Sequence, residues 1–268
     1  MFLDITCRRN PNLIKAAVEL HQKGEISPNT YVVDLDAVEA NARLIAEAAR
    51  VSGLSLYFMT KQVNRNPQFA KAVAGQGISK AVAVDWDEAL TLHQNGIAIG
   101  HVGHLVQVPQ KVISSLLSVG PEVLTVFSVD KAAQIAREAR RLGLEQPILL
   151  RVVGEDDQFF PGQVGGIPEG QFREAASAIA RLKGVRIAGV TSFPCLILDE
   201  ESGRAVPSSN MGTLRRAAHL LRTQLGLSVE QVNAPGMTAA GTISLLAQEG
   251  ATHGEPGHGL TGTTPLHA

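Results

Sequence analysis

The sequence predicts a single (β/α)8 barrel, on the basis of its length, its alternating apolar patterns and the number of strands that these patterns supply. The chain has 268 residues, close to the ~250 residues typical of this fold. Short runs rich in Val, Ile and Leu alternate with longer segments that have the apolar spacing of amphipathic helices. Eight such runs follow position 50, and eight parallel strands close a barrel of this type.

The predicted elements follow one another in the order that a barrel requires. A leading helix is expected over 12–23, then a strand over 31–35 and a helix over 37–50. Residues 1–30 are therefore expected to form a helical lead-in, and residues 31–268 the barrel. The eight barrel strands are expected to end near Thr60, Val84, Gly103, Ser128, Val153, Ser192, Asn233 and Glu255.

The strand patterns favour a parallel sheet. Segments such as KAVAV (80–84) and PILLRVV (147–153) are almost wholly apolar, which is typical of strands covered by helices. An open doubly wound sheet is the alternative, and it is disfavoured by the strand count and by the lack of an early Gly-x-Gly-x-x-Gly segment. The most polar stretch, 199–210, is expected to be a surface loop on the barrel's top face.

Composition excludes several classes of partner and compartment. Hydrophobic residues make up 44% and charged residues 18%, as in ordinary globular proteins. Lys and Arg number 24 against 25 Asp and Glu, so the net charge of −1 gives no attraction to nucleic acid or anionic membranes. No signal peptide or membrane span is expected. Cys7 and Cys195 form no CxxC pair, so the chain is expected to be reduced and cytoplasmic.

Lys61 is the first candidate functional residue. It follows the apolar strand LSLYFMT, and the carboxyl ends of barrel strands are where active sites form. A lysine at the mouth of the barrel is expected to be partly desolvated, which favours the neutral amine that condenses with an aldehyde. The alternative interpretation is a strand-end lysine whose amine simply reaches solvent.

Glycine-rich segments follow the last two predicted strands. They are NAPGMTAAGT (233–242) and GEPGHGLTGTT (254–264). Backbone N–H groups in such turns and nearby hydroxyls bind phosphate, and barrels often place that site after strands 7 and 8. Together with Lys61 they favour an aldehyde that carries a phosphate, such as pyridoxal 5'-phosphate (PLP).

Several of these segments resemble the alanine-racemase-like, fold-type III PLP proteins, so the barrel is expected to be of the alanine racemase N-terminal type. The segment over 31–45, with Asn41 in its helix, is similar to the first segment of those barrels. LYFMTK is similar to their PLP-lysine strand, 99–112 to the third strand of single-domain PLP-homeostasis proteins, and PGMT (235–238) to the Gly-Met-Ser phosphate turn of that same group.

Glu255 is the residue most informative about mechanism. It lies in GEPGHG, which is similar to the Glu-Pro-Gly-Arg segment of ornithine and diaminopimelate decarboxylases. The resemblance implies that Glu255 pairs with the pyridine nitrogen, where a carboxylate favours the protonated ring, a strong electron sink. Alanine racemases carry Arg in the corresponding segment.

The resemblance implies roles for three further residues. Lys61 forms the Schiff base and then acts as acid or base at the substrate Cα. Arg151 either supports the cofactor or makes a structural ion pair, and it is expected to pair with Glu255 or Asp85 because an unpaired buried charge is costly. His101 is either a proton carrier near the ring or a satisfied core residue.

The remaining cofactor contacts are implied by the same resemblance. His258 stands where the decarboxylases have a phosphate-binding Arg, and Ser192 or Cys195 would replace a ring-contacting His. The cofactor-binding set is therefore Lys61, Ser192, Gly236, Thr238, Glu255, Gly257, His258, Gly259 and Leu260.

The favoured function is a PLP-dependent amino-acid racemase. The alternatives are a non-catalytic PLP carrier and a PLP-dependent decarboxylase or aldolase. The sequence stops soon after the eighth predicted strand, so the C-terminal β-domain that supplies the second base in alanine racemases is expected to be absent. A small-molecule amino acid is the expected partner, and a homodimer is possible by the resemblance.

A metal-dependent hydrolase or aldolase is a third interpretation. His253, Glu255 and His258 lie close in sequence and could combine with His101, His104 and Asp85. The spacing His-x-Glu-x-x-His is not a zinc motif. No metal site is therefore expected.

Overall fold

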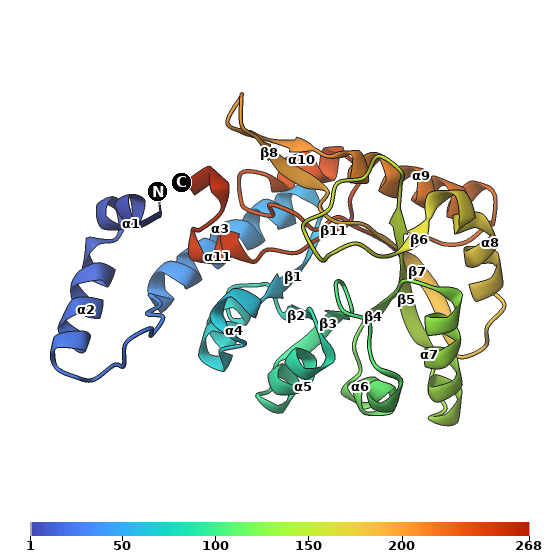
Figure 1. Ribbon diagram of the computed structural model, residues 1–268, viewed down its shortest axis with the longest axis horizontal. Coiled ribbons are helices and arrows are strands. Elements are labelled where there is room, and N and C mark those ends of the chain that lie inside the picture. Colours follow the sequence, from blue (N-terminus) through green and yellow to red (C-terminus); the bar gives the residue numbers. More distant parts are fainter. Residues whose placement is uncertain (1, 268) are drawn as a thin grey trace.

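The computed structural model describes residues 2–267 and contains a closed barrel of eight parallel strands (Figure 1). The strands pair in the order β4-β3-β2-β1-β11-β10-β7-β5, and pairing of β4 with β5 closes the ring. The predicted fold class is thereby confirmed. The barrel strands are β1 (Ser55–Met59), β2 (Lys80–Ala83), β3 (Ala98–Val102), β4 (Val123–Val126), β5 (Gln146–Val153), β7 (Val185–Thr191), β10 (Gln231–Asn233) and β11 (His253–Gly254).

Helices form the outer layer around these strands, while α1 and α2 lie to one side (Figure 1). The α-helices are α1 (Phe2–Arg9), α2 (Pro11–Gln22), α3 (Leu35–Ser52), α4 (Pro67–Ala74), α5 (Trp86–Gln94), α6 (Ile113–Val119), α7 (Val129–Arg141), α8 (Glu169–Ile179), α9 (Ser209–Thr223), α10 (Ile243–Gln248) and α11 (His258–Thr261). Short 3-10 turns are η1 (Lys61–Val63), η2 (Gln110–Val112) and η3 (Pro265–His267). Strand β6 (Ile167–Pro168) extends the sheet beside β5.

The barrel has an apolar interior, which is separate from the larger core between strands and helices. Six buried side chains fill this interior: Tyr57, Met59, Val82, Val123, Leu149 and Ala188. Alternate residues of a strand point to opposite faces, so Tyr57 and Met59 lie in this inner cluster while Phe58 packs in the outer core. Gly100 leaves room for the Tyr57 ring, because a Cβ at Gly100 would lie 2.1 Å from Tyr57 Cδ1. This apolar plug forms the floor of the barrel mouth.

Two predicted elements are wrong. Residues 31–34 have no regular structure, because β1 already pairs with β2 and β11 and leaves no free edge for another strand. Asp34 instead begins α3, where its side chain accepts from Ala37 N at 3.1 Å. The polar stretch 199–210 contains the hairpin of β8 (Leu196–Asp199) and β9 (Arg204–Pro207) and the start of α9, rather than a plain loop.

Within residues 2–30 the chain forms two helices, of which only α2 is predicted. Helix α2 has no buried residue, and its N-cap Asn10 donates to Asp34 at 2.6 Å, which connects it to the start of α3. The division into a lead-in over 1–30 and a barrel over 31–268 stays a prediction. Among the helices within residues 2–267, none has the length and apolar character required to cross a membrane.

Candidate active site

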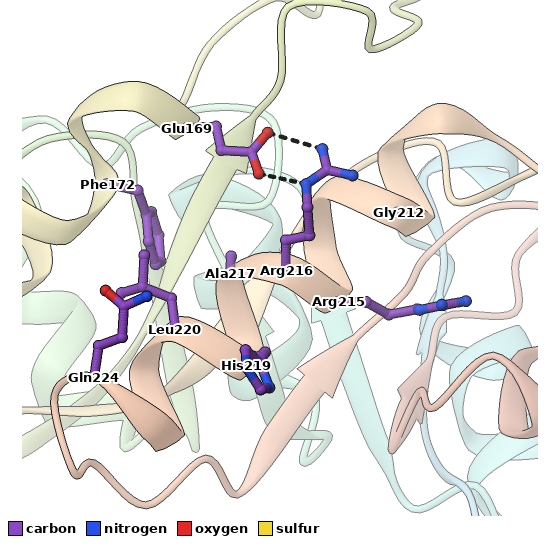
Figure 2. Close-up of a pocket in the computed structure, with 9 residues that line it drawn as sticks. All are labelled: Glu169, Phe172, Gly212, Arg215, Arg216, Ala217, His219, Leu220 and Gln224. Carbon is purple, nitrogen blue, oxygen red and sulfur yellow. Dashed lines mark hydrogen bonds and ion pairs between the residues drawn. The ribbon is translucent and has the colours of Figure 1, made fainter.

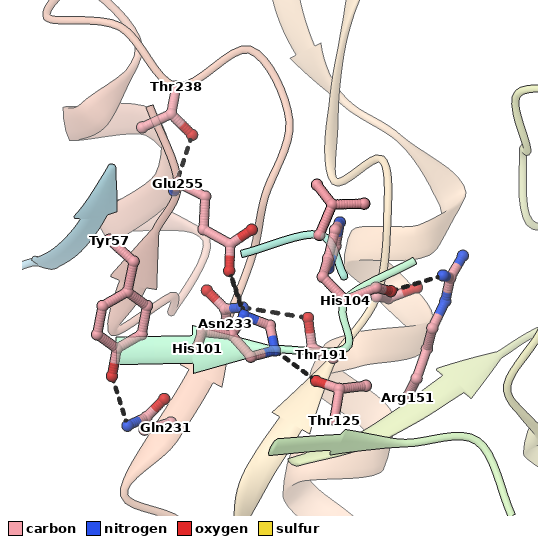
Figure 3. A network of polar contacts seen from close by, with 12 residues as sticks. Tyr57, His101, His104, Thr125, Arg151, Thr191, Gln231, Asn233, Thr238 and Glu255 are labelled. Carbon is pink, nitrogen blue, oxygen red and sulfur yellow. Dashed lines mark hydrogen bonds and ion pairs between the residues drawn. The ribbon is translucent and has the colours of Figure 1, made fainter. Parts of the chain in front are cut away.

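A buried polar network lies across the barrel mouth, above the apolar interior. Figure 3 shows Glu255, His101, Asn233 and Thr125 linked by dashed contacts. These residues come from the segment after β11 and from β3, β10 and β4, four strands that are distant in sequence. The parallel barrel brings them together because all of its strands point their carboxyl ends to the same side.

Glu255 is the centre of this network. Its Oε1 accepts hydrogen bonds from His101 Nδ1 at 2.6 Å and from Asn233 Nδ2 at 2.8 Å, whereas its buried Oε2 has no hydrogen-bond partner. Burial raises the pKa of the carboxyl, but the hydrogen bonds from His101 and Asn233 lower it, so that this pKa lies below its ordinary value. Glu255 is therefore a buried carboxylate at neutral pH, with one oxygen free.

His101 is fully engaged by its neighbours. Its Nδ1 contacts Glu255, and its Nε2 lies 2.5 Å from Thr125 Oγ1. The side chain of His101 is completely buried. This geometry makes His101 a positioning residue for Glu255, and its predicted role as a proton carrier stays a prediction.

His104, in the loop after β3, is also buried, but neither of its ring nitrogens has a hydrogen-bond partner. Its ring lies edge-on to Phe193, with centroids 5.1 Å apart. Burial lowers the pKa of His104 to about 3, although the charge of Glu255 opposes this shift. The imidazole is therefore neutral and has unused hydrogen-bonding groups.

Arg151 does not make the predicted ion pair with Glu255 or Asp85. Its guanidinium donates to the carbonyls of His104 and Gln163 at 3.0 and 2.8 Å. It also lies 5.0 Å from the centre of the Phe127 ring, a cation–π distance. Burial lowers the pKa of Arg151 to about 10, so it stays charged at neutral pH. Backbone carbonyls and an aromatic face thus take the place of the predicted carboxylate, while Nε of Arg151 is buried without a hydrogen-bond partner.

Asp85 is engaged elsewhere. Its carboxylate pairs with Arg65 at 2.9 Å and caps α5 by accepting from Glu88 N at 2.8 Å. It therefore lies outside the network of Glu255.

Lys61 is the first residue of η1, directly after β1, and its side chain is exposed. The predicted partial desolvation is therefore wrong, because the lysine lies on the rim rather than within the mouth. Lys61 and His258 line the same cavity of about 770 Å³, which the N-terminal helices border on the other side. The lysine thus faces a cavity between the barrel rim and the N-terminal helices, and Glu255 is not among the residues that line it.

A buried carboxylate fixes the turn that carries Lys61. Glu88 accepts from Thr60 Oγ1 at 2.8 Å and from Val84 N at 2.7 Å. The sequence reasoning missed Glu88. The signal was present as the Asp-x-x-Glu pattern of Asp85 and Glu88, a capping-box spacing at the start of α5.

The two glycine-rich segments follow β10 and β11, as predicted, and they meet near Glu255. Thr238 is buried, and its Oγ1 accepts from Glu255 N at 3.3 Å. Gly236 has a φ of +134°, which disfavours any side chain. A Cβ at Gly259 would lie 2.6 Å from the Thr238 carbonyl oxygen. The two segments are therefore in close backbone contact.

The other predicted cofactor residues differ in their exposure. A Cβ added at Gly257 would lie 3.4 Å from Met59 Cβ, which is an ordinary van der Waals contact. Leu260 is buried, and its carbonyl accepts from Asn41 Nδ2 at 3.0 Å. His258 is exposed and contacts Thr263 Oγ1 through Nδ1 at 2.9 Å. The predicted phosphate segment is thus connected to α3 through Asn41.

Ser192 follows β7, and its buried hydroxyl has no hydrogen-bond partner. The Cys195 thiol donates to the carbonyl of Ser192 at 3.2 Å. Burial is the main cause that raises the pKa of Cys195. The hydroxyl of Ser192 is therefore the freer of the two candidate ring contacts.

A second pocket, of about 530 Å³, lies between α8 and α9, away from these strand ends (Figure 2). Glu169 and Arg216 form two hydrogen bonds of 2.6 and 2.8 Å there. Arg215 contacts Glu249 at 2.6 Å. Because these charges neutralise one another, we place the candidate active site at the barrel mouth.

The sequence that forms this barrel matches a known protein family. The family described as alanine racemase, N-terminal domain, matches residues 33–265. The chain belongs to this family.

The chain is similar to a curated relative, the uncharacterized protein YhfX of Escherichia coli (strain K12). The two are 42% identical over 267 residues, a match that covers 100% of this chain and 69% of the relative. The family assignment therefore does not by itself specify a reaction.

Solved structures show the same alanine racemase-type barrel. Alanine racemase from Corynebacterium glutamicum is similar with a TM-score of 0.69 and 17% identity, covering 87% of this chain and 63% of that one. D-threonine aldolase from Filomicrobium marinum gives 0.66 and 17%, covering 88% and 62%. The chain thus spans about six tenths of each solved chain, and these low identities show a shared fold.

Proposed function

We propose that this member of the alanine racemase N-terminal domain family binds PLP and acts at the Cα of an amino acid, with racemisation as the favoured reaction. The observation that carries the proposal is Glu255, a buried carboxylate with a free oxygen. It lies among the same strand ends as Lys61 and the glycine-rich segments. This arrangement fits a cofactor with a basic ring nitrogen, an aldehyde and a phosphate.

The residues at the mouth fit PLP on three counts. The free Oε2 of Glu255 can accept from a protonated pyridine nitrogen, which a carboxylate stabilises. Gly236 and Gly259 allow close backbone contacts within the glycine-rich segments, and backbone N–H groups in such turns can bind a phosphate. Lys61 makes no ion pair with any residue of 2–267, so its amine is available to an aldehyde.

The chain's own residues then have defined tasks. Bound PLP would supply an electron sink for the charge that develops at Cα. His101 and Asn233 hold Glu255 ionised and correctly oriented through their hydrogen bonds to Oε1. The Lys61 amine would remove or return the proton at Cα. Thr238 and the backbone of Gly236 and Gly257 would bind the phosphate.

Glu255 supports any reaction that passes through negative charge at Cα, so decarboxylation and aldol cleavage use the same residues. The family match and the structural similarity of this chain to an alanine racemase favour racemisation. The D-threonine aldolase neighbour keeps aldol cleavage as the second candidate. A carrier would bind PLP at the same residues without turnover.

An exchange screen tests the proposal. PLP-loaded protein is incubated with each L-amino acid in deuterated water, and the Cα–H signal is followed by NMR together with the chirality of the product. We expect loss of the Cα–H signal and appearance of the D-enantiomer for one amino acid or a small group, and neither for Lys61→Ala. PLP binding without exchange of any amino acid would contradict an enzymatic function and would support a carrier.

A further inference from the structure

Three buried side chains at the barrel mouth form a cluster whose donor atoms suit a metal ion. One nitrogen of His101, one nitrogen of His104 and one oxygen of Glu255 all lie within 4.8 Å of one another. The sequence suggested a different set that included His253 and His258. In the structure His253 stacks on Tyr57 and is absent from this cluster.

Some donor atoms of the cluster have no partner. Both ring nitrogens of His104 and Oε2 of Glu255 are buried without a hydrogen bond. Buried polar atoms are costly unless they are paired. Other contacts position His104. Its backbone carbonyl accepts a hydrogen bond from Arg151, and its ring makes edge-to-face contacts with Phe193 and His101. Its nitrogens are therefore fixed in place but unused, and Figure 3 shows no dashed contact at the ring.

The other donor atoms already have the outer contacts that metal ligands require. A metal-bound histidine usually donates its second N–H to an oxygen, and a ligating carboxylate is usually hydrogen-bonded as well. His101 Nε2 lies 2.5 Å from Thr125 Oγ1, and Asn233 donates to Glu255 at 2.8 Å. A metal at His101 Nδ1 would displace the proton from that atom. Nε2 would carry the ring proton and donate it to Thr125, whose hydroxyl can accept as well as donate.

We propose that His101, His104 and Glu255 form a binding site for one divalent transition-metal ion, and that this ion and PLP exclude each other. Two imidazoles and one carboxylate are a ligand set used for Zn²⁺, with a fourth position left open. Mg²⁺ and Ca²⁺ are disfavoured because they require mostly oxygen ligands. The exclusion follows because both occupants use Glu255. Metal binding itself is independent of the proposed function, whereas the exclusion rests on it.

Cobalt(II) is a suitable probe, because it replaces Zn²⁺ and its visible absorption reports coordination by nitrogen and oxygen. The PLP-free full chain is titrated with CoCl₂. We expect saturable visible absorption at one equivalent per chain. His104→Gln removes one ligand at similar size and should weaken binding by at least about 100-fold, since loss of an outer contact alone weakens metal sites ~10–100-fold.

Matched controls separate this result from misfolding and from surface binding. His219→Gln makes the same chemical change in the pocket between α8 and α9, and it should bind Co²⁺ like the wild type. Glu255→Gln provides a second ligand variant that preserves side-chain size, and it should also lose the absorption. Absence of saturable absorption in the wild type, or equal binding by His104→Gln, would overturn the metal site.

The exclusion is tested by adding the two occupants in either order. Protein loaded with ZnSO₄ should take up PLP only after EDTA is added, and PLP-loaded protein should show no cobalt absorption. Simultaneous binding of Co²⁺ and PLP would overturn the exclusion. Cobalt binding by a wild-type protein that takes up no PLP would refute the proposed function and leave the metal site intact.

Discussion

Replacement of Gly259 by alanine perturbs the contact between the two glycine-rich segments. The new Cβ would lie 2.6 Å from the carbonyl oxygen of Thr238 and 3.3 Å from Ala239 Cα. The segments must move apart by about 0.8 Å, which is the difference between 2.6 Å and the 3.4 Å at which ordinary contact begins. Forcing an extra methyl group into a packed site costs about 1–3 kcal/mol.

If the bound phosphate requires the wild-type spacing of these segments, that cost weakens PLP binding by about 5- to 150-fold, because 1.4 kcal/mol corresponds to a factor of ten. The assay is a PLP titration followed by absorbance, together with urea unfolding. Gly241→Ala is the matched control, since Gly241 lies in the other glycine-rich segment and its Cβ would meet nothing within 4 Å. If Gly259→Ala binds PLP with the wild-type affinity and unfolds at the wild-type urea midpoint, the proposed contact is refuted.

Three further predictions concern buried ionisable groups. Burial lowers the pKa of His253 to about 4, so the unfolded chain binds a proton more readily than the folded protein, and the free energy of unfolding falls as pH drops from 6.5 towards 4. In His253→Phe the free energy of unfolding, measured with urea, should change less over this pH range. An unchanged pH dependence would contradict the assignment of this effect to His253. Burial raises the pKa of Glu88. The contribution of protonated Glu88 to the free energy of unfolding is therefore present at or below pH 4.5 and is lost as pH rises through the folded-state pKa. Glu88→Gln can still accept from Val84 N and donate to Thr60, and its unfolding midpoint should therefore fall less than that of wild type as pH rises above 4.5; an equal fall would show that Glu88 is not responsible. Glu255→Gln should retain PLP on Lys61 but slow Cα–H exchange, measured by NMR, by at least about 100-fold, which is the usual effect of removing a group that stabilises developing charge. Exchange at the wild-type rate would exclude the proposed pairing of Glu255 with the pyridine nitrogen.

The sequence predicted the barrel well because its signals are local. Each strand is a short apolar run, and Lys61, Asn233 and Glu255 directly follow or end such runs. The strand expected over 31–35 is wrong for a reason that no local pattern contains: the closed ring has no free edge for it. The apolar residues at 31–33 lead instead into Asp34, the N-cap of α3.

Contacts to backbone atoms were the main part of the site that the sequence could not predict. Arg151 was expected to need a carboxylate, but the carbonyls of His104 and Gln163 and the Phe127 ring satisfy it. Carbonyl groups are present at every residue, so the sequence carries no mark of which ones converge. The exposure of Lys61 likewise depends on where η1 turns out of the barrel.

The central claim is that the Lys61 amine binds the PLP aldehyde, and borohydride reduction tests it most directly. The PLP-loaded chain is reduced and digested, and the modified peptide is identified by mass spectrometry, with Lys61→Ala treated in parallel. We expect one phosphopyridoxyl group, located on Lys61, and none in the variant. A label on another lysine, or equal labelling of Lys61→Ala, would contradict it.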